Sequence, residues 1–211
     1  MYAHVVVAFQ ASLLDVEDEP CVGRLDPTRT RLADGAWVDV QRGWIAGSDA
    51  LFERLRESVP WHAERRPMYD RVVDVPRLLA FYGEDDPLPD TTVIGAKRVL
   101  DDYYAPELGE CFATAGLCLY RDGRDSVAWH GDRIGRGNTE DTIVAILVLG
   151  APRALALRPR GGGRALHYVL GHGDLFVMGG SCQRTWEHAV PKTAKPVGPR
   201  ISVQFRPRGV Q

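Results

Sequence analysis

Hydrophobic residues in the second half of the chain occur in short runs that are separated by glycine and other turn-forming residues. Runs of this length, apolar throughout or alternating with polar residues, are typical of β-strands. We expect strands over residues 112–120, 142–149, 154–157, 166–170, 174–178 and 201–205. The run 142–149 is almost continuously apolar, as in a strand buried on both faces. Frequent strands with glycine-rich joins favour a sandwich or jelly roll over a βαβ sheet.

The first half of the chain is more mixed and predicts helices as well as strands. Short strands are expected at residues 5–9 and 37–40. Ser48 is the expected N-cap of a helix whose apolar residues recur at helical spacing and that Pro60 ends. This helix is expected to pack on the outside of a sheet. A second helix is expected over residues 92–104, ended by Pro106.

Residues 60–92 contain many prolines and glycines, and we expect them to form a loop-rich connection. This segment mixes arginines with aromatic residues, a combination that suits a flat, anionic ligand such as a nucleotide base. A solvated connection whose aromatic side chains tuck into the core would have the same composition, so both interpretations stay open.

Composition narrows the class of protein. The chain has 211 residues, of which 45% are hydrophobic and 26% charged, as expected for one ordinary soluble domain. A net charge of −2 provides no global positive field for nucleic acid. Four cysteines without a CxxC pair favour neither a zinc knot nor a disulfide framework. With no signal peptide and no apolar run near membrane length, we expect a cytoplasmic protein that does not span a membrane.

The candidate chemistry centres on His130 and Asp132, which lie two residues apart between strand-like runs. In an extended segment such residues point to the same side and can reach one metal ion. A His-x-Asp pair alone is also common in surface loops and among hydrogen-bonded buried residues. His188 offers a matching imidazole downstream, and two imidazoles with one carboxylate are the ligand set of non-haem Fe(II) oxygenases. Glu187 is not expected to be a ligand, because adjacent strand residues face opposite sides.

A second candidate feature is the strictly alternating segment from Arg200 to Arg206. Arg200, Ser202, Gln204 and Arg206 share one face, while the residues between them are apolar. The polar face is either solvated or lines an internal cavity. Two guanidinium groups downstream of the candidate metal ligands favour the cavity. Arginine binds a carboxylate through two parallel hydrogen bonds, as a dicarboxylic cosubstrate requires.

Together these residues resemble the AlkB family of Fe(II)- and 2-oxoglutarate-dependent dioxygenases, over about residues 60–207. The matching pieces are LYRDGRDS at 119–126, WHGD at 129–132, GHGDL at 171–175, WEHAVP at 186–191, and the arginines at 200 and 206. The resemblance implies a mainly β, α+β fold: a double-stranded β-helix, or jelly roll, with N-terminal helices and a substrate-recognition lid. Residues 1–91 would form the N-terminal extension and lid, and residues 92–207 a helix plus the catalytic jelly roll.

The resemblance also implies the cofactors. His130, Asp132 and His188 would bind Fe(II), with 2-oxoglutarate and O2 as cosubstrates. Arg200 would pair with the distal carboxylate of 2-oxoglutarate, Tyr120 would hydrogen-bond nearby, and Arg206 would lie closer to the metal-chelating end.

Three departures from the family pattern affect the details. Cys118 and Ser202 stand where family members commonly have asparagines at the cosubstrate site. Arg133 follows the iron aspartate, where base-repairing members often have acids that help to recognise the damaged base. The family also includes RNA-, protein- and lipid-directed members, so the substrate is the least constrained feature.

For a nucleic-acid substrate, the expected binding residues are Arg77, Tyr82, Trp129 and Arg133. Arg77 and Tyr82 resemble lid residues, and a flipped base needs a stacking partner and cations for the backbone. Arg136 is a further candidate phosphate contact, although each such arginine is more often simply a surface residue.

The leading hypothesis is a monomeric dioxygenase that removes alkyl groups from bases of single- or double-stranded DNA or RNA. A second hypothesis keeps the iron chemistry but hydroxylates a small molecule or a protein side chain. A third is a non-enzymatic jelly-roll binding module with structural histidines, against which the paired arginines argue.

Overall fold

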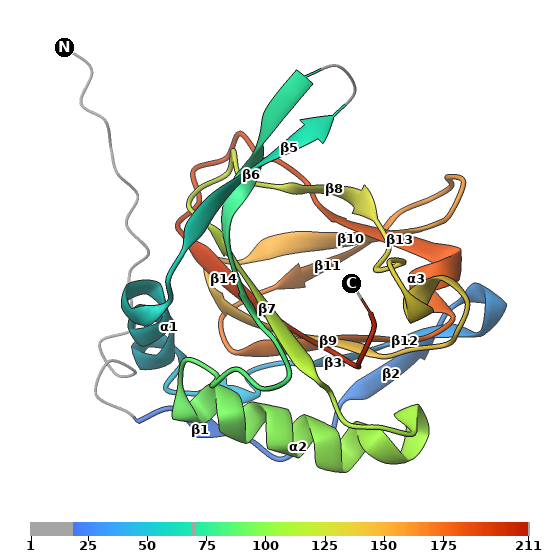
Figure 1. The fold of residues 1–211 in the computed structure, drawn as a ribbon, viewed down its shortest axis with the longest axis horizontal. Coiled ribbons are helices and arrows are strands. Elements are labelled where there is room, and N and C mark those ends of the chain that lie inside the picture. Colours follow the sequence, from blue (N-terminus) through green and yellow to red (C-terminus); the bar gives the residue numbers. More distant parts are fainter. Residues whose placement is uncertain (1–18, 69–70, 211) are drawn as a thin grey trace.

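A computed structural model describes residues 19–68 and 71–210 of the chain. Two antiparallel β-sheets face each other, and two helices cover the outer face of the larger sheet (Figure 1). This arrangement confirms the expected jelly roll with flanking helices. The strand expected at residues 5–9 lies outside the described residues.

The larger sheet has eight strands and the smaller has four. In spatial order the larger sheet contains β2 (Thr28–Arg31), β3 (Ala36–Gln41), β12 (Asp174–Gly180), β9 (Val144–Gly150), β14 (Arg200–Arg206), β7 (Thr114–Tyr120), β6 (Arg71–Tyr82) and β5 (His62–Met68). The smaller sheet contains β11 (Leu166–Leu170), β10 (Arg153–Pro159), β13 (Trp186–Val190) and β8 (Val127–His130). The helices are α1 (Ser48–Ser58), α2 (Thr91–Leu108) and the short α3 (Cys182–Thr185), and β1 (Cys21–Val22) pairs with β4 (Ile45–Ala46). Single 3-10 turns occur at Ala33–Gly35 and Arg136–Asn138.

The central strand β9 explains the almost continuous apolar run in the sequence. All seven of its residues are buried, because both faces of the strand are covered. Ala145, Leu147 and Leu149 belong to the hydrophobic cluster beneath the helices, and the alternate residues Val144 and Ile146 belong to the cluster between the two sheets. The expectation of a strand buried on both faces is therefore confirmed.

The neighbouring strand β14 has two chemically different faces. Ile201, Val203 and Phe205 pack into the cluster beneath the helices. Arg200 and Arg206 lie on the opposite face and line a cavity between the sheets. The alternation in the sequence thus places the arginines inside the molecule instead of on a solvated surface.

Both predicted helices are present, but their ends differ from the prediction. Gly47, in the left-handed conformation with φ 61°, is the N-cap of α1, and the Ser48 hydroxyl donates a hydrogen bond to the Ile45 carbonyl. Pro106 lies within the last turns of α2 without ending it. The helix ends at Gly109, whose φ of 82° suits a residue without a side chain.

The loop-rich prediction for residues 60–92 is wrong, because β5 and β6 form a long hairpin there that projects from the body (Figure 1). Prolines suggested a loop, since proline cannot donate to a strand ladder. Pro76 instead lies beyond the residues of β6 that pair with β7, where the pairing with β5 is also irregular. A proline costs little at such a position, and the hairpin carries part of the lining of the site described below.

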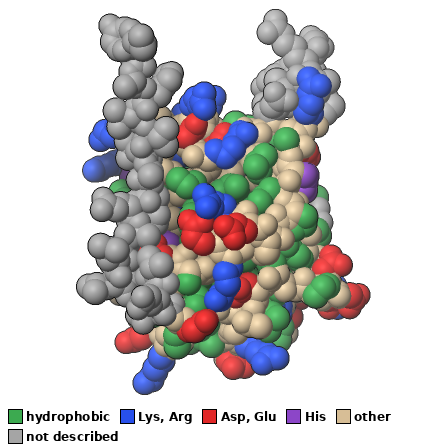
Figure 2. All heavy atoms as spheres, turned by 90° about the vertical axis from the view of Figure 1, so that its left-hand side faces the viewer, with side chains coloured by type: hydrophobic (Ala, Val, Ile, Leu, Met, Phe, Trp, Pro, Cys, Tyr) green, Lys and Arg blue, Asp and Glu red, His purple; other side chains and the backbone are tan. Residues whose placement is uncertain are grey.

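Charged side chains of both signs are mixed on the face of the molecule that carries α1. Figure 2 shows basic and acidic side chains next to one another there, without a continuous basic patch. All four cysteines are free thiols. None of the helices in the described part of the chain is long and apolar enough to cross a membrane.

Candidate metal and cosubstrate site

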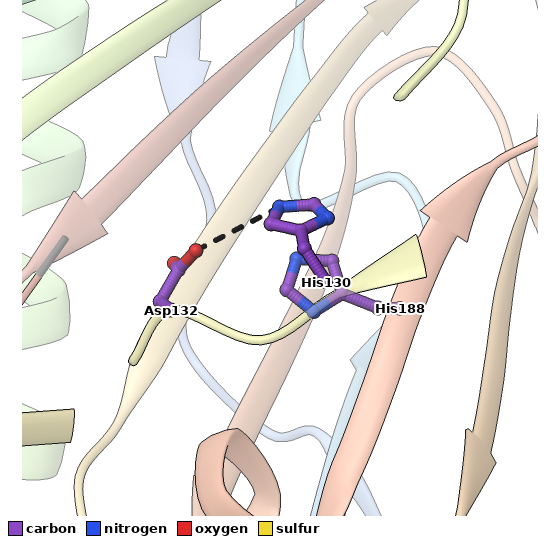
Figure 3. A group of neighbouring side chains, drawn as sticks. All are labelled: His130, Asp132 and His188. Carbon is purple, nitrogen blue, oxygen red and sulfur yellow. Dashed lines mark ion pairs between the residues drawn. The ribbon is translucent and has the colours of Figure 1, made fainter. Parts of the chain in front are cut away.

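His130, Asp132 and His188 converge in one place between the two sheets (Figure 3). His130 ends β8, Asp132 follows two residues later, and His188 lies in the neighbouring strand β13. One possible ligand atom from each residue lies within 4.8 Å of the others. The three side chains predicted from the sequence to bind one metal ion are therefore close enough to do so.

A β-bulge turns His130 towards this site. His188 pairs with His130 and Val190 pairs with Val127, so three steps along β8 lie opposite two along β13. In a regular strand, residues three apart face opposite sides, but the extra residue of a bulge re-aims the side chain. Both Val127 and His130 consequently line the cavity between the sheets.

The two imidazoles are placed to act as metal ligands. Nδ1 of His130 lies 2.9 Å from the Ala128 carbonyl oxygen, which can only accept, so Nδ1 carries the proton and Nε2 keeps its lone pair. The pKa of His188 is lowered to about 3, mainly by burial. The neighbouring His130 also lowers this pKa, by more than Asp132 raises it. At neutral pH the His188 ring is therefore neutral and can offer a nitrogen lone pair to a metal.

Asp132 is 4% exposed and is held at both its backbone and its side chain. Its backbone N–H donates to Oε1 of Gln183 over 2.8 Å, and Nε of Arg206 donates to Oδ2 over 2.7 Å. Burial alone would raise the pKa of Asp132, but the charge of Arg206 and the adjacent histidines hold it at about 2. The carboxylate is therefore ionised and oriented, and the donor set fits a non-haem Fe(II) ion.

Arg200 supplies the clearest sign of a ligand beside the triad. It is 1% exposed, and its Nε and Nη1 have no hydrogen-bond partner among the described residues. A buried guanidinium with free N–H groups is costly unless an anion meets it. The Tyr120 ring lies beneath it, 5.2 Å from Cζ to the ring centroid, and burial raises the pKa of Tyr120 to about 12, so the phenol keeps its proton. Arg200 and Tyr120 together fit a carboxylate.

The inner cavity, of about 60 Å³, brings most of the predicted cofactor residues together with the two histidines. These residues are Cys118, Tyr120, Arg200, Ser202 and Arg206. A larger outer cavity, of about 350 Å³, opens beside it under the β5–β6 hairpin. The two cavities share Arg77, Cys118, Gln204 and Arg206 in their linings, so they are contiguous. A small acid fits the inner cavity, and only the outer one has room for a larger substrate.

Of the four residues predicted to bind substrate, the structure places only Arg77 in these cavities. Arg77 donates from Nη1 to the Ser126 carbonyl over 3.1 Å, and its buried Nε has no partner among the described residues. Leu79 and Phe81 follow it on the same face of β6 and line the outer cavity with it. The hairpin therefore takes part in the site through residues at alternate positions.

The other three predicted substrate residues do not lie at the mouth of the site. Tyr82 is on the opposite face of β6 from Phe81 and packs against the cluster beneath the helices. Trp129 stacks with Arg158, 4.2 Å from its ring centroid, and Arg158 forms an ion pair with Glu187. Glu187 is thus engaged by Arg158, and the group of possible metal ligands among the described residues is His130, Asp132 and His188.

The arginines after the iron motif are similarly placed elsewhere. Arg133 lines neither the inner nor the outer cavity. Arg136 forms ion pairs with Glu110, at 2.7 Å, and with Glu140, at 3.0 Å, so its charge is already neutralised. Neighbourhood along the chain was a poor guide here, because Arg133 and Arg136 closely follow Asp132 but line neither cavity.

Three residues of the site were missed by the sequence interpretation. Gln183 holds the backbone of Asp132, Gln204 lines both cavities, and Phe81 lines the outer one. Gln204 could have been found from its place on the polar face of the segment 200–206. Phe81 would have followed from strand alternation with Arg77 had the hairpin been recognised, whereas no sequence signal indicates Gln183.

Comparisons with known proteins also point to a 2OG-Fe(II) oxygenase. A family model described as the 2OG-Fe(II) oxygenase superfamily matches residues 108–206. The chain is 32% identical over 188 residues to alpha-ketoglutarate-dependent dioxygenase alkB homolog 3 of Bos taurus, covering 77% of this chain and 64% of the relative. The Homo sapiens protein of that name is 31% identical over 199 residues, covering 82% and 66%. The chain thus spans slightly less than two thirds of the length of these relatives.

A further relative is the DNA oxidative demethylase ALKBH2 of Arabidopsis thaliana, 31% identical over 135 residues, covering 52% of this chain and 42% of the relative. Among solved structures, OsALKBH1 superposes with a TM-score of 0.59 at 12% identity, covering 86% of this chain and 100% of that one. A prolyl hydroxylase from Trichoplax adhaerens gives a TM-score of 0.58 at 10% identity, covering 80% and 82%. These two likenesses concern the fold.

Proposed function

We propose that this chain, which is similar to AlkB-like 2OG-Fe(II) oxygenases, removes alkyl groups oxidatively from nucleobases, using Fe(II), 2-oxoglutarate and O2. One observation carries the proposal. The buried Arg200, whose Nε and Nη1 have no partner among the described residues, lines the same cavity as His130 and His188. A non-enzymatic jelly-roll module would have no use for a buried, unpaired cation beside two imidazoles and an ionised carboxylate.

The three candidate metal ligands, and Arg200, Tyr120 and Arg206 of the inner cavity, have specific roles in this proposal. His130, Asp132 and His188 hold Fe(II), which when bound supplies the chemistry that activates O2 together with the 2-oxo acid. Arg200 binds the distal carboxylate of 2-oxoglutarate through its free N–H groups, and the Tyr120 hydroxyl donates a further hydrogen bond. Arg206 keeps Asp132 ionised and oriented and faces the opposite, chelating end of the cosubstrate.

The substrate would be an alkylated base whose alkyl carbon reaches the triad from the outer cavity. The relatives named as DNA oxidative demethylases support a nucleic acid, and we extend this to single- or double-stranded DNA or RNA. With a net charge of −2, the chain would rely on local contacts at the mouth, such as Arg77, for affinity. We further propose that the protein acts as a monomer in the cytoplasm, where its free thiols would stay reduced.

The test is turnover of a methylated single-stranded oligonucleotide carrying 1-methyladenine or 3-methylcytosine, supplied with Fe(II), 2-oxoglutarate and O2. We expect loss of 14 mass units, the mass of one CH2 group, from the oligonucleotide and formation of succinate in equal amount. Vigorous 2-oxoglutarate turnover without demethylation of any alkylated oligonucleotide would contradict the substrate and send the search to small molecules or proteins. Intact demethylation by the His130→Ala protein would contradict the metal site.

A further inference from the structure

The floor of the outer cavity has a gap at Gly116. Phe81 of β6 pairs directly with Gly116 of β7, which pairs in turn with Gln204 of β14. Directly paired residues share a face of a sheet, and all three line the outer cavity. An aromatic ring and a carboxamide are therefore separated by a residue without a side chain. We call the space above Gly116, bounded by Phe81, Gln204 and Arg206, the Gly116 notch.

Two polar atoms lie over this glycine. A methyl group built at Gly116 would stand 2.9 Å from Nη1 of Arg206 and 3.3 Å from Oε1 of Gln204. Gly116 is not among the glycines with positive φ, so the backbone here does not require glycine. The absence of a side chain instead lets the ends of Arg206 and Gln204, one hydrogen-bond donor and one acceptor, lie close over the backbone of β7.

The orientation of the Gln204 amide is fixed by Ser202. Nε2 of Gln204 donates to the Ser202 carbonyl oxygen over 3.1 Å and to the Ser202 hydroxyl over 2.5 Å. Since a backbone carbonyl only accepts hydrogen bonds, the amide nitrogen must be on that side and the amide oxygen on the notch side. The Gln204 side chain thus presents an acceptor, and not a donor, to a ligand.

This acceptor is buried and weakly satisfied. Gln204 is 8% exposed, and its Oε1 receives the Cys118 thiol at 3.7 Å, which is a weak donor. A carbonyl oxygen can accept two hydrogen bonds, so a strong donor on a ligand would improve the site. Phe81, which is 55% exposed, provides an aromatic surface beside it. The notch therefore fits the edge of a flat heterocycle that carries an N–H group.

We infer that Gln204 is a specificity-determining residue that accepts a hydrogen bond from the exocyclic amine of the alkylated base in the Gly116 notch. The inference rests on the proposed function and narrows its substrate. Cytosine offers an amine at ring position 4, where uracil has a carbonyl oxygen. That oxygen would face Oε1 of Gln204 as one acceptor against another, which a site built for hydrogen bonding rejects. The protein thus favours 3-methylcytosine over 3-methyluracil, which differ in this group and in the positive charge that 3-methylcytosine carries when it is protonated.

The experiment measures kcat/KM on two oligonucleotides that differ only in carrying 3-methylcytosine or 3-methyluracil. We expect the preference for 3-methylcytosine to fall about tenfold in Gln204→Met, which keeps the length of the side chain but removes the acceptor. Gln204→Glu replaces the carboxamide by a carboxylate, which still accepts hydrogen bonds, and is expected to keep the preference. The matched control is Gln41→Met, because Gln41 bonds to Arg24 and Asp26 far from the cavities. Thermal melting checks that each variant is folded.

A second variant tests the notch itself. Gly116→Ala places a methyl group against Arg206 and Gln204, and we expect it to weaken binding of both oligonucleotides about tenfold. Binding is measured by fluorescence anisotropy with Mn(II) and 2-oxoglutarate under anaerobic conditions, so it does not depend on turnover. Gly95→Ala is the matched control, because its methyl group meets only Val22, at an ordinary 3.5 Å.

The possible outcomes separate the two claims. An unchanged preference in Gln204→Met, or unchanged binding by Gly116→Ala, while the wild-type protein demethylates 3-methylcytosine, would overturn the role of the notch and leave the proposed function intact. If the wild-type protein consumed 2-oxoglutarate but demethylated neither oligonucleotide, the proposed function would be contradicted. The proposed hydrogen bond from a base amine to Gln204 would be contradicted with it.

Discussion

Arg200 and Arg206 lie six residues apart on the same face of β14 and line the same inner cavity, yet their environments are opposite. Nε and Nη1 of Arg200 have no partner among the described residues, whereas Nε of Arg206 donates to Asp132 over 2.7 Å. One guanidinium is thus kept for a ligand that arrives from outside, and the other is committed to a metal ligand of the protein itself. The two arginines of this strand therefore have different roles: Arg200 is available to bind a ligand, and Arg206 orients a candidate metal ligand.

The largest effect is expected from Asp132→Ala, because Asp132 is both a candidate metal ligand and the partner of Arg206. Loss of an outer partner of a metal ligand typically reduces affinity 10- to 100-fold, so loss of the ligand itself should reduce Fe(II) affinity by more than about 100-fold. Equilibrium dialysis against Fe(II) under argon measures this. Glu187→Ala, next to His188 but directed to Arg158, is the control and should bind iron normally. Equal affinities in the two variants would exclude Asp132 as a ligand.

The next effect separates the two arginines by the ligand they serve. Arg200→Met should raise the KM for 2-oxoglutarate roughly 30- to 1000-fold, because removing one partner of a buried charge pair costs about 2–4 kcal/mol of binding free energy. Arg206→Met should instead lower Fe(II) affinity by about 10- to 100-fold, through the loss of orientation of Asp132. Succinate formation as a function of 2-oxoglutarate and of Fe(II) gives both values. The same response in both variants would remove the distinction between the arginines.

Replacing the two arginines by methionine should change the stability of the protein in opposite directions when metal and 2-oxoglutarate are absent. Arg200→Met replaces a buried, unpaired cation by an apolar side chain and should raise the free energy of unfolding by about 1 kcal/mol. Arg206→Met leaves Asp132 buried without its partner and should lower it by about 3 kcal/mol. For a chain of this size the melting temperature should rise by about 2–4 °C and fall by about 6–12 °C, respectively. Destabilisation by both substitutions would show that Arg200 is already paired.

The smallest effect is expected from Tyr120→Phe. The phenol keeps its proton because burial raises its pKa to about 12, and it contributes one neutral donor beside Arg200. A hydrogen bond of this kind contributes about 0.5–1.5 kcal/mol, so the KM for 2-oxoglutarate should rise about two- to tenfold. Tyr168→Phe, a removal of the same hydroxyl from β11, serves as the control. A change as large as that in Arg200→Met would contradict the secondary role of Tyr120 and give it the same weight as Arg200 in binding the cosubstrate.

The face of β14 that lines the cavity was predictable from the sequence because it depends on alternation alone. Period-two alternation assigns Arg200 and Arg206 to one side, and the apolar residues between them must be buried. The ligand spacing in residues 130–132 was equally readable. Both features are set within a few residues, so no knowledge of the tertiary structure was needed.

Other features depend on pairing between distant strands and could not be read in this way. The prolines of residues 60–92 hid the β5–β6 hairpin, since nothing in the sequence tells that Pro76 lies where the ladder is irregular. Without the hairpin, Tyr82 was chosen over Phe81, which is one residue away on the face that lines the cavity. The β8 bulge and the Gly116 notch likewise exist only through register with neighbouring strands.

The central claim is that the triad and Arg200 form one site for Fe(II) and a dicarboxylic 2-oxo acid. Its most direct test is an anaerobic titration of the purified protein with Fe(II) and 2-oxoglutarate, followed through the weak visible charge-transfer absorption of the chelate. We expect the band to appear at one equivalent of each ligand in the wild-type protein and to require at least about 30-fold more 2-oxoglutarate in Arg200→Met. A folded wild-type protein that gives no band, or an unchanged band in Asp132→Ala, would contradict the account.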